Sequence, residues 1–487
     1  MGGCPPRVRL MPKFSRAFGI NKVQEELDFV DVPLHTDAWL FIDPFAISQR
    51  VDPWSQRCHL TLTTFFQAIV DRIRAGSLDD ARELLAYLRE PNETRFGLSK
   101  KRPAGAGIGP HQAQQLFDAL KDSSAVKTGF LASLEECELM IEGIGRDKIS
   151  DLTTNVIRAH LIQYTQDQCA LHGVPVKNVA VAPCFDPGTL QWESRYADLP
   201  VWKNQPVILV PKAVARYAIA YDHQNYYRDY VLRFLQAEAL EAGSSLVRTL
   251  KNKKRVVYKK DLQKSFPLSK DFLYRFSKDH PKVLQRYRED LSRLESTNRS
   301  AVVEEQDEAV IAGALATALA TIPAGNANAS EYHSLMIGAL EFLLFPDLLN
   351  PRKENEIHQG RKRIDILMEN GARQGIFHRL HDVRKLPCSF VPIECKNYST
   401  EIANPELDQL AGRFSVNRGK FGFLCCRTFE DRTLFVERCR DTFKDDRGLI
   451  VPLDDNTILI LLDKVQKGLR REIDAELTKL INEVWVS

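Results

Sequence analysis

The chain of 487 residues carries 67 Lys and Arg against 64 Asp and Glu, which leaves a net charge of only +3. So small an excess excludes a bulk polycation, and any binding of nucleic acid must therefore depend on local basic patches. The hydrophobic content of 44% is ordinary for a globular protein that buries a core, and the length corresponds to about three domains.

The ten cysteines form no C-x-x-C pair, which excludes the usual zinc-ribbon and thioredoxin spacings. We expect reduced, mostly buried thiols in a cytoplasmic protein. The N-terminal residues lack the apolar region of a signal peptide, and the alanine-rich run at 309–322 is shorter than the roughly 20 residues that a membrane span requires. We therefore expect no membrane partner.

Residues 1–200 are expected to form an N-terminal recognition or regulatory domain in which short strands and helices are mixed. The segment 37–43 is typical of a strand. Segments 60–76 and 78–89 repeat apolar residues at intervals of three and four, as amphipathic helices do.

Two glycine turns in this region resemble the helix-hairpin-helix elements that bind DNA. In that motif the backbone amides of the turn and a helix N-terminus hold a phosphate group. The turn residues and their basic neighbours are Lys101, Arg102, Gly107, Gly109, Gly143, Gly145 and Arg146. The alternative is a pair of ordinary glycine turns that precede helices.

Residues 201–300 are expected to form a helical, basic middle region. It opens with the apolar segment 206–211, and helices are predicted at 225–241 and 270–294. Between them, the window 248–264 holds eight Lys or Arg in 17 residues. The residues expected to contact nucleic acid phosphates are Lys253, Lys254, Arg255, Lys259 and Lys260. A solvated surface is the alternative interpretation of this window.

Residues 308–487 alternate strand and helix patterns, which favours a mixed sheet flanked by helices. Strands are predicted at about 361–369, 389–396, 421–426 and 449–453, and helices at 331–345, 404–414, 435–444 and 456–484. The chain as a whole is thus expected to be an α/β (α+β) multidomain protein whose C-terminal sheet follows a mixed, mostly helical N-terminal region.

Two acids and a lysine are expected to meet in this third domain. Asp365 lies in an apolar strand, where an isolated carboxylate is costly unless it is paired, protonated or bound to a cation. Glu394 and Lys396 are two residues apart and share one face of the next strand. If the strands pair, Asp365, Glu394 and the carbonyl of Cys395 offer oxygen ligands to Mg²⁺, for which Mn²⁺ can substitute.

This layout resembles the PD-(D/E)XK nuclease superfamily, which includes restriction-endonuclease-like and Mrr-type enzymes. The resemblance covers about residues 328–455 and implies a restriction-endonuclease-like fold. It also implies a further acid on the first helix, for which Glu331 is the better candidate and Glu341 the second, and a helical glutamine, Gln409. The 28 residues between Asp365 and Glu394 exceed the usual hairpin, so an insertion at about 371–388 is expected.

The resulting hypothesis is a Mg²⁺-dependent endonuclease that hydrolyses phosphodiester bonds, with DNA as the first choice of substrate and restriction or antiviral defence as the role. No Walker-type phosphate loop is present, so a motor ATPase would be a partner protein, and a homodimer is the other expected assembly. Two alternatives stay open: a catalytically silent nuclease fold that binds nucleic acid or a partner, and an RNA or structure-specific repair nuclease.

Overall fold

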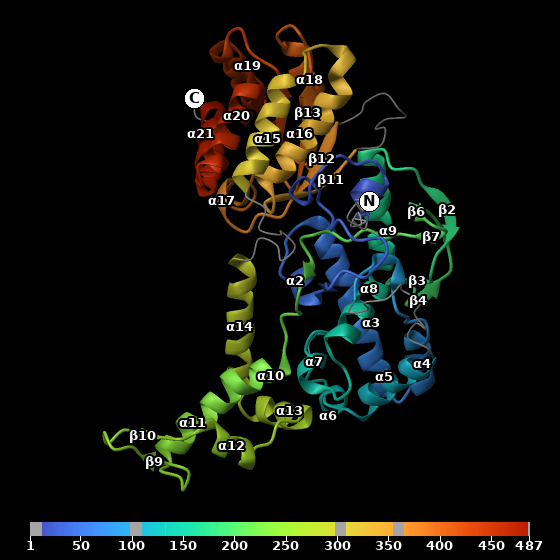
Figure 1. The fold of residues 1–487 in the computed structure, drawn as a ribbon, viewed down its shortest axis with the longest axis vertical. Coiled ribbons are helices and arrows are strands. Elements are labelled where there is room, and N and C mark those ends of the chain that lie inside the picture. Colours follow the sequence, from blue (N-terminus) through green and yellow to red (C-terminus); the bar gives the residue numbers. More distant parts are fainter. Residues whose placement is uncertain (1–11, 98–109, 132, 298–307, 354–364, 486–487) are drawn as a thin grey trace, which may run out of the picture.

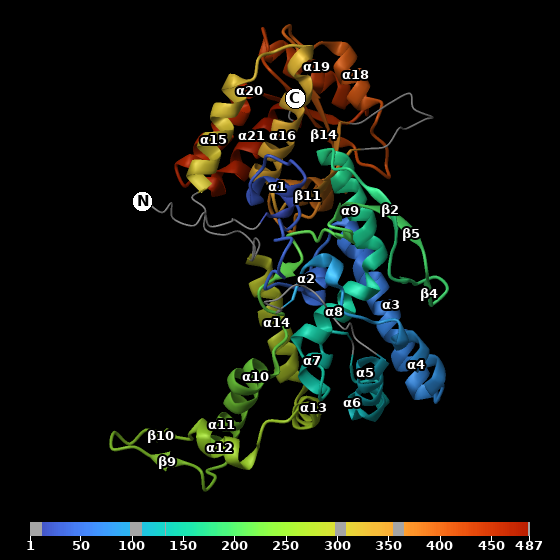
Figure 2. The ribbon, with the colours of Figure 1, turned by 45° about the vertical axis from the view of Figure 1, so that its right-hand side comes forward.

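The structure is a computed structural model that describes residues 12–97, 110–131, 133–297, 308–353 and 365–485. Its apolar residues gather in two large cores. One core runs from Phe14 to Leu291, and the other joins Ile311–Val484 with Leu171. Figures 1 and 2 show the C-terminal part, in yellow to red, at one end of the molecule and a projecting green segment at the other.

The first part of the chain is a helical body with short two-stranded sheets on its surface. Its helices are α1 (Phe14–Ala17), α2 (Pro44–Ser48), α3 (Pro53–Ala75), α4 (Leu78–Ala86), α5 (Pro110–Asp122), α6 (Ser124–Lys127), α7 (Cys137–Met140), α8 (Arg146–Val156) and α9 (Arg158–His172). Its strands are β1 (Phe41–Ile42), β2 (Lys177–Ala180), β3 (Cys184–Asp186), β4 (Gln191–Glu193), β5 (Tyr196–Leu199), β6 (Val201–Trp202), β7 (Gln205–Pro206) and β8 (Ala215–Arg216).

The middle part is helical apart from one hairpin. Its elements are α10 (His223–Tyr226), a π-helical stretch (Tyr227–Val231), α11 (Leu232–Glu241), β9 (Arg248–Thr249), β10 (Arg255–Val256), α12 (Lys259–Ser265), α13 (Lys270–Asp279) and α14 (Pro281–Thr297). Its buried residues, Tyr226 and Leu273 among them, belong to the same core as the first part. The division of residues 1–300 into two domains stays a prediction.

The C-terminal part is a five-stranded mixed sheet with helices, which confirms the predicted α/β class. The strands are β11 (Leu348–Arg352), β12 (Ile366–Asn370), β13 (Phe390–Lys396), β14 (Phe421–Cys426) and β15 (Leu449–Asp454), in that order. β12 pairs antiparallel with β11 on one side and with β13 on the other, whereas β13, β14 and β15 run parallel. The helices are α15 (Glu308–Thr321), α16 (Ala329–Leu344), α17 (Gly375–His378), α18 (Asn404–Ala411), α19 (Arg432–Lys444), α20 (Asp455–Gln466) and α21 (Ile473–Trp485).

Several sequence expectations differ from the structure in detail. The helices predicted at 270–294 and 456–484 are each divided in two, into α13 and α14 and into α20 and α21. Residues 207–210 are buried as predicted, but they run as an extended segment outside the strands, with the Val210 carbonyl accepting from Val30 N–H at 3.0 Å. The edge strand β11 was not predicted, because Asn350 and Pro351 interrupt its apolar pattern and a β-bulge separates its pairings. The predicted insertion before β13 contains α17 and a π-helical stretch.

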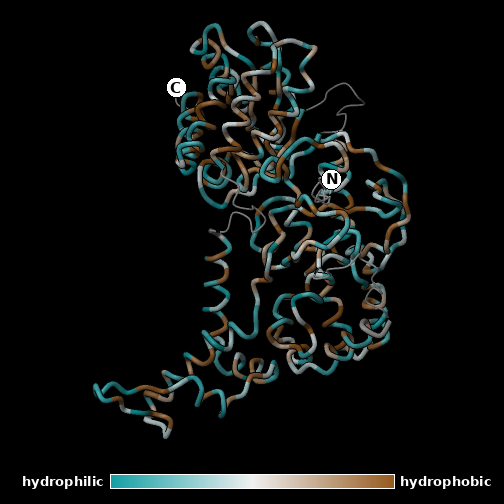
Figure 3. Tube along the Cα trace, viewed as in Figure 1, coloured by the Kyte–Doolittle hydropathy of each residue, from teal (hydrophilic) through white to brown (hydrophobic). Residues whose placement is uncertain are grey.

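Among the described residues, no helix has the length and apolar character needed to cross a membrane. Figure 3 shows apolar residues, in brown, interspersed with polar residues, in teal, along the trace of both bodies.

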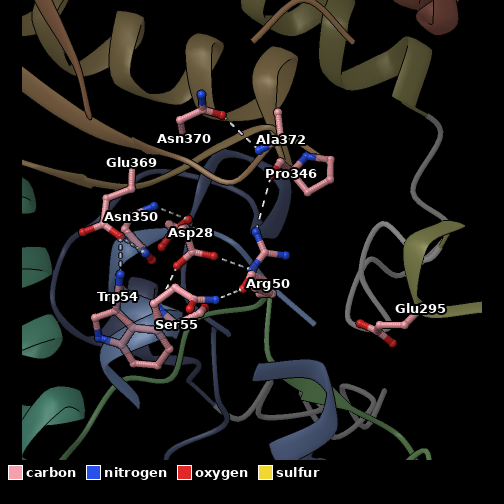
Figure 4. A network of polar contacts seen from close by, with 12 residues as sticks. Asp28, Arg50, Trp54, Ser55, Glu295, Pro346, Asn350, Glu369, Asn370 and Ala372 are labelled. Atoms are coloured by element: carbon pink, nitrogen blue, oxygen red, sulfur yellow. Dashed lines mark hydrogen bonds and ion pairs between the residues drawn. The ribbon is translucent and has the colours of Figure 1, made fainter. Parts of the chain in front are cut away.

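A buried polar network joins the C-terminal sheet to the first part of the chain (Figure 4). Glu369 on β12 is 1% exposed, and its Oε2 accepts from the Trp54 backbone N–H at 2.8 Å and from Asn350 Nδ2 at 3.1 Å. Its Oε1 lies 3.7 Å from Arg57 Nη2 and 3.6 Å from Arg352 Nη1. A buried carboxylate is tolerated only with such partners, so Glu369 fixes β12 against the start of α3.

A second buried group lies at the same junction and contains two acids and one lysine. Lys212 Nζ contacts Glu341 Oε1 at 3.0 Å, and both side chains are almost wholly buried. The neighbouring Asp28 accepts from Tyr164 Oη at 2.7 Å and from the Asn350 backbone N–H at 3.1 Å. Burial raises the pKa of both acids, that of Glu341 to about 8, and in Asp28 the neighbouring Lys212 and these hydrogen bonds oppose the increase. Glu341 is therefore protonated at pH 7.

This assignment predicts how stability depends on pH. The ordinary pKa of a glutamate is 4.5, and in the folded chain that of Glu341 is raised to about 8. Its contribution to stability is therefore complete below about pH 4.5 and is lost as the pH rises through about 8. Glu341→Gln keeps the shape of the side chain but removes its ionisable group. Between about pH 6 and pH 9, the melting temperature of this variant should therefore fall less than that of the parent.

Differential scanning fluorimetry across that range measures the difference. Glu331→Gln changes an exposed acid on the same helix and should follow the parent curve. Parallel curves for Glu341→Gln and the parent would contradict a protonated Glu341.

Candidate functional site

The pairing of β12 with β13 brings the predicted aspartate and glutamate together. Ile366 lies opposite Ile393 in this antiparallel register, so Asp365 and Glu394 are the next facing pair. Facing residues on antiparallel strands have Cβ atoms about 5 Å apart and point to the same side. The Asp365 carboxylate also accepts from the Cys395 backbone N–H at 2.9 Å. The condition on which the predicted site depends, that the two strands are neighbours, is confirmed.

Glu394 is fully buried and is surrounded by cationic and amide groups. Lys396 Nζ lies 3.2 Å from its Oε2, and Gln409 Nε2 donates to the same oxygen at 3.4 Å. Arg413, itself 2% exposed, forms an ion pair with Oε1. Asp365, Glu394, Lys396 and Gln409 thus lie in one cluster, and their two negative charges face the two positive charges of Lys396 and Arg413.

Helix α18 supplies Gln409, and Arg413 follows two residues after its end. Pro405 occupies the first turn, where its missing N–H costs nothing, and Glu406 accepts from the Ala403 backbone N–H at 2.9 Å. At the end of β13, Asn397 donates to the carbonyls of Pro323 and Gly325 at 3.1 and 2.8 Å. The loop before α16 therefore holds the strand end that carries Lys396.

His333 on α16 also reaches the cluster, although no sequence pattern around it indicated such a role. Its ring hydrogen-bonds to the Asp365 backbone, and burial lowers its pKa, so the imidazole is neutral at pH 7. Its Nε2 is buried without a hydrogen-bond partner among the described residues. Arg413 was missed as well: it stands four residues after Gln409, but α18 ends before it, so helical spacing alone did not indicate its direction.

Cys395 lies between Glu394 and Lys396 and is in register with Cys425 on the parallel strand β14. The side chains of the two cysteines are hydrogen-bonded, and this contact together with burial raises the pKa of the Cys395 thiol. All nine cysteines of the described residues are free, and eight of them are buried. Low-pKa thiols of the kind that act as nucleophiles are therefore not a feature of this site.

Glu331 lies in the first turn of α16 and is exposed. Within the described residues, no recorded contact joins it to Asp365 or Glu394. Glu341, the second candidate acid, is instead buried against Lys212 at the junction described above.

The second glycine turn precedes α8 in an acidic setting. Gly143 has a φ of +75°, and Gly145 is the N-cap of the helix. Arg146 Nη2 lies 3.6 Å from Asp222 Oδ2. Burial and neighbouring acids raise the pKa of Asp151 to about 8, which indicates crowded negative charge near this helix start. The first turn, with Lys101, Arg102, Gly107 and Gly109, lies outside the described residues.

The basic residues predicted to bind phosphate lie on the β9–β10 hairpin and at the start of α12. Lys253, Lys254, Arg255 and Lys260 are exposed, and Lys259 is half-buried. They lie at the end of the molecule opposite to the C-terminal sheet (Figure 1). The structure therefore does not place them with Asp365 and Glu394.

The cluster contains oxygen donors suited to a divalent cation, but the number of these donors is small. Among the described residues, no group of three or more His, Cys, Asp or Glu side chains is arranged to hold a metal ion. The available carboxylates are those of Asp365 and Glu394, and Mg²⁺ commonly needs only one or two because it keeps several of its waters.

Comparison with known proteins adds one match. A family model described as a domain of unknown function (DUF8370) matches residues 19–222, which end one residue before α10. No curated protein and no solved structure matches the chain. The candidate site on β12 and β13 lies outside the matched residues.

Proposed function

We propose that the chain is a Mg²⁺-dependent nuclease whose C-terminal part is a restriction-endonuclease-like domain of the PD-(D/E)XK type. The observation that carries this proposal is the facing pair Asp365 and Glu394 with Lys396 3.2 Å from the glutamate. Two acids and a lysine at the ends of paired strands form a constellation suited to phosphodiester hydrolysis.

The residues present fit a magnesium ion in their chemistry. Asp365, Glu394 and the carbonyl of Cys395 are hard oxygen donors, and Mn²⁺ accepts the same ligands. When bound, the ion would polarise the phosphate and lower the pKa of a water ligand. Lys396 then holds the attacking water and offsets negative charge on the phosphate, while Gln409 and Arg413 orient the Glu394 carboxylate. Glu331 is proposed as the further acid near the start of α16.

The wider role follows by analogy with this layout. A nuclease domain that follows some 300 residues of a proposed recognition region suits a cytoplasmic restriction or antiviral defence enzyme that acts on DNA. A homodimer is the simplest assembly that cuts both strands, and an ATPase partner would supply any motor activity.

Substitution of Asp365 and Lys396 tests the proposed role of these two residues in phosphodiester hydrolysis. Asp365→Asn and Lys396→Met should each slow plasmid cleavage in Mg²⁺ on the order of 100-fold or more, because each removes a charge needed at the phosphate. Glu331→Gln should have a smaller effect, since that side chain is exposed. Rates are read from single-turnover gels at saturating enzyme.

The ion pair between Asp463 on α20 and Lys467, the residue after the end of that helix, is 2.6 Å long and provides matched controls. Asp463→Asn and Lys467→Met remove the same two charges from an exposed surface and should cleave at the parent rate. Cleavage by Asp365→Asn at the rate of these controls would refute the mechanism. Parallel assays on plasmid, branched DNA and RNA separate DNA, repair and RNA substrates.

A second candidate function is a catalytically silent nuclease fold that binds nucleic acid or a partner. The observation that favours it is the ion pair between Arg413 and Glu394. An arginine on this carboxylate already neutralises it, so a metal ion must compete with a buried cation. The same contact could therefore weaken metal binding or replace it.

Removal of the arginine distinguishes the two candidates. Arg413→Met frees one Glu394 oxygen, so Mn²⁺ should bind about tenfold more tightly than to the parent, as the loss of a competing charge predicts. Electron paramagnetic resonance of free Mn²⁺ measures the affinity without a cleavage assay. Arg447→Met breaks a surface pair with Asp408 at 2.7 Å and is the control. If neither the parent nor Arg413→Met binds Mn²⁺, the silent fold is the better description.

A further inference from the structure

The positive charge of this protein is concentrated in one short segment. Residues 248–264 contain eight Lys or Arg and one acid, Asp261, a net charge of +7. The whole chain has a net charge of +3, so the remaining residues sum to 3 − 7 = −4. The chain is therefore an acidic body with one strongly basic segment.

The first part of this segment, residues 248–256, is the β9–β10 hairpin, which projects away from the rest of the molecule, and the remainder enters α12 (Figures 1 and 2). In β9 and β10, Thr249 faces Arg255. The turn is closed by hydrogen bonds from Leu250 N–H to the Lys254 carbonyl and from Lys253 N–H to the Leu250 carbonyl, both at 2.9 Å. Lys253 has a φ of +63° at the turn. We call residues 248–260 the basic arm.

The cations of the basic arm fall into two groups. Three of them brace it: Arg248 pairs with Asp261 at 2.9 Å, Arg255 donates to the Leu240 carbonyl at 3.2 Å, and Lys259 lies 3.5 Å from Asp229. The others are exposed, and their side-chain ammonium groups have no ion-pair or hydrogen-bond partner within the described part of the chain. They are Lys251, Lys253, Lys254 and Lys260.

The base of the arm is fixed to the first part of the chain rather than to the C-terminal sheet. Lys270 on α13 hydrogen-bonds through its backbone N–H to Glu142 at 2.9 Å, and His223 Nδ1 lies 2.7 Å from Glu138 Oε1. Arg216 on β8 forms an ion pair with Glu295 on α14. The exposed lysines of the arm therefore have no internal partner and lie on a segment that is held in place at its base. They are available to bind an external anion.

We propose that the basic arm is a sequence-independent grip for the phosphate backbone of double-stranded DNA, separate from the cleavage site. The choice of DNA as the partner rests on the proposed nuclease function. Lysines contact phosphates as point charges and carry no base information, so the arm would add affinity to any duplex without selecting a sequence. Because the arm and β12 lie at opposite ends of the molecule, the arm acts on binding and leaves the chemical step unchanged.

The composition of the tip favours nucleic acid over an anionic membrane. The tip reads Lys251-Asn252-Lys253-Lys254, four polar residues, and the single apolar side chain beside it, Leu250 at 37% exposed, is small compared with the apolar face of a helix that enters a lipid interface. The exposed aromatic residue of the arm, Tyr258, is 46% exposed and lies beneath Arg248, whose guanidinium carbon is 5.5 Å from the ring centroid. That arrangement directs a cation and a ring to the same surface, as nucleic-acid-binding surfaces do.

The test reverses the charge of the free lysines at the tip in the full chain. A variant carrying Lys251→Glu, Lys253→Glu and Lys254→Glu should bind a labelled duplex at least about tenfold more weakly at physiological salt. The slope of log Kd against log salt should fall by up to about 2.7, since each lost phosphate contact removes about 0.9. Fluorescence anisotropy in EDTA measures both quantities without cleavage.

The matched control reverses three exposed lysines on other elements: Lys127, Lys177 and Lys479. It changes the net charge by the same amount and should leave the affinity within about twofold of the parent. Equal losses in both variants, or no loss in the arm variant, would overturn the proposal. An arm variant that loses binding to phosphatidylserine vesicles but keeps duplex binding would overturn it in favour of a lipid partner.

Cleavage measured in parallel separates this proposal from the proposed nuclease. If both hold, the arm variant cleaves saturating DNA at the parent rate but needs more DNA to reach it. If the parent binds duplex through the arm and never cleaves, the arm stands and the nuclease fails. A melting temperature equal to that of the parent shows that the arm variant is folded.

Discussion

The arrangement of this protein depends on a carboxylate buried between two bodies. Glu369 accepts a backbone hydrogen bond from Trp54 at the start of α3 and lies on β12, four residues after Asp365. At about 3.3 Å per residue, the two acids are only about 13 Å apart along one strand. Because a buried carboxylate stripped of its partners costs several kcal/mol, roughly 3–5 in comparable pairs, the two bodies are held together at the strand that presents the candidate aspartate. The buried group formed by Asp28, Lys212 and Glu341 closes the same junction.

The candidate site is balanced in charge, and this balance explains why two functions compete. Asp365 and Glu394 face each other, as a metal site requires, while Lys396 and Arg413 already compensate them. In a nuclease, Lys396 takes part in the chemistry and Arg413 competes with Mg²⁺ for Glu394. In a catalytically silent fold, both residues only stabilise the structure. The net charge of the whole chain is divided in a similar way, since residues 248–264 carry a net charge of +7 and the remaining residues a net charge of −4.

The sequence predicted the C-terminal sheet well because its strands are short apolar runs between helices with clear starts. The predicted strand at 421–426 matches β14, and the helix predicted from Asn404 begins at that residue. Alternation along a strand predicted that Glu394 and Lys396 share one face, whereas their meeting with Asp365 was conditional on the pairing of the two strands. Arg413, His333 and the junction around Glu369 could not be predicted, because their roles come from contacts between segments far apart in the chain. Such contacts leave no local period in the sequence. The loss of strand character at 207–210 has the same cause, since that segment pairs with Val30 rather than with a neighbouring strand.

The burial of the cysteines makes site-specific labelling of this protein practical. Eight of the nine described thiols are buried and the ninth, Cys395, is shielded by Cys425, so alkylating reagents should find few targets in the folded chain. With Cys4, which lies outside the described residues, changed to serine, a single cysteine introduced at Asn252 would be the preferred point of attachment for a fluorophore. A dye at that position would directly report contact with a labelled polymer. The buried cysteines would all stay in place.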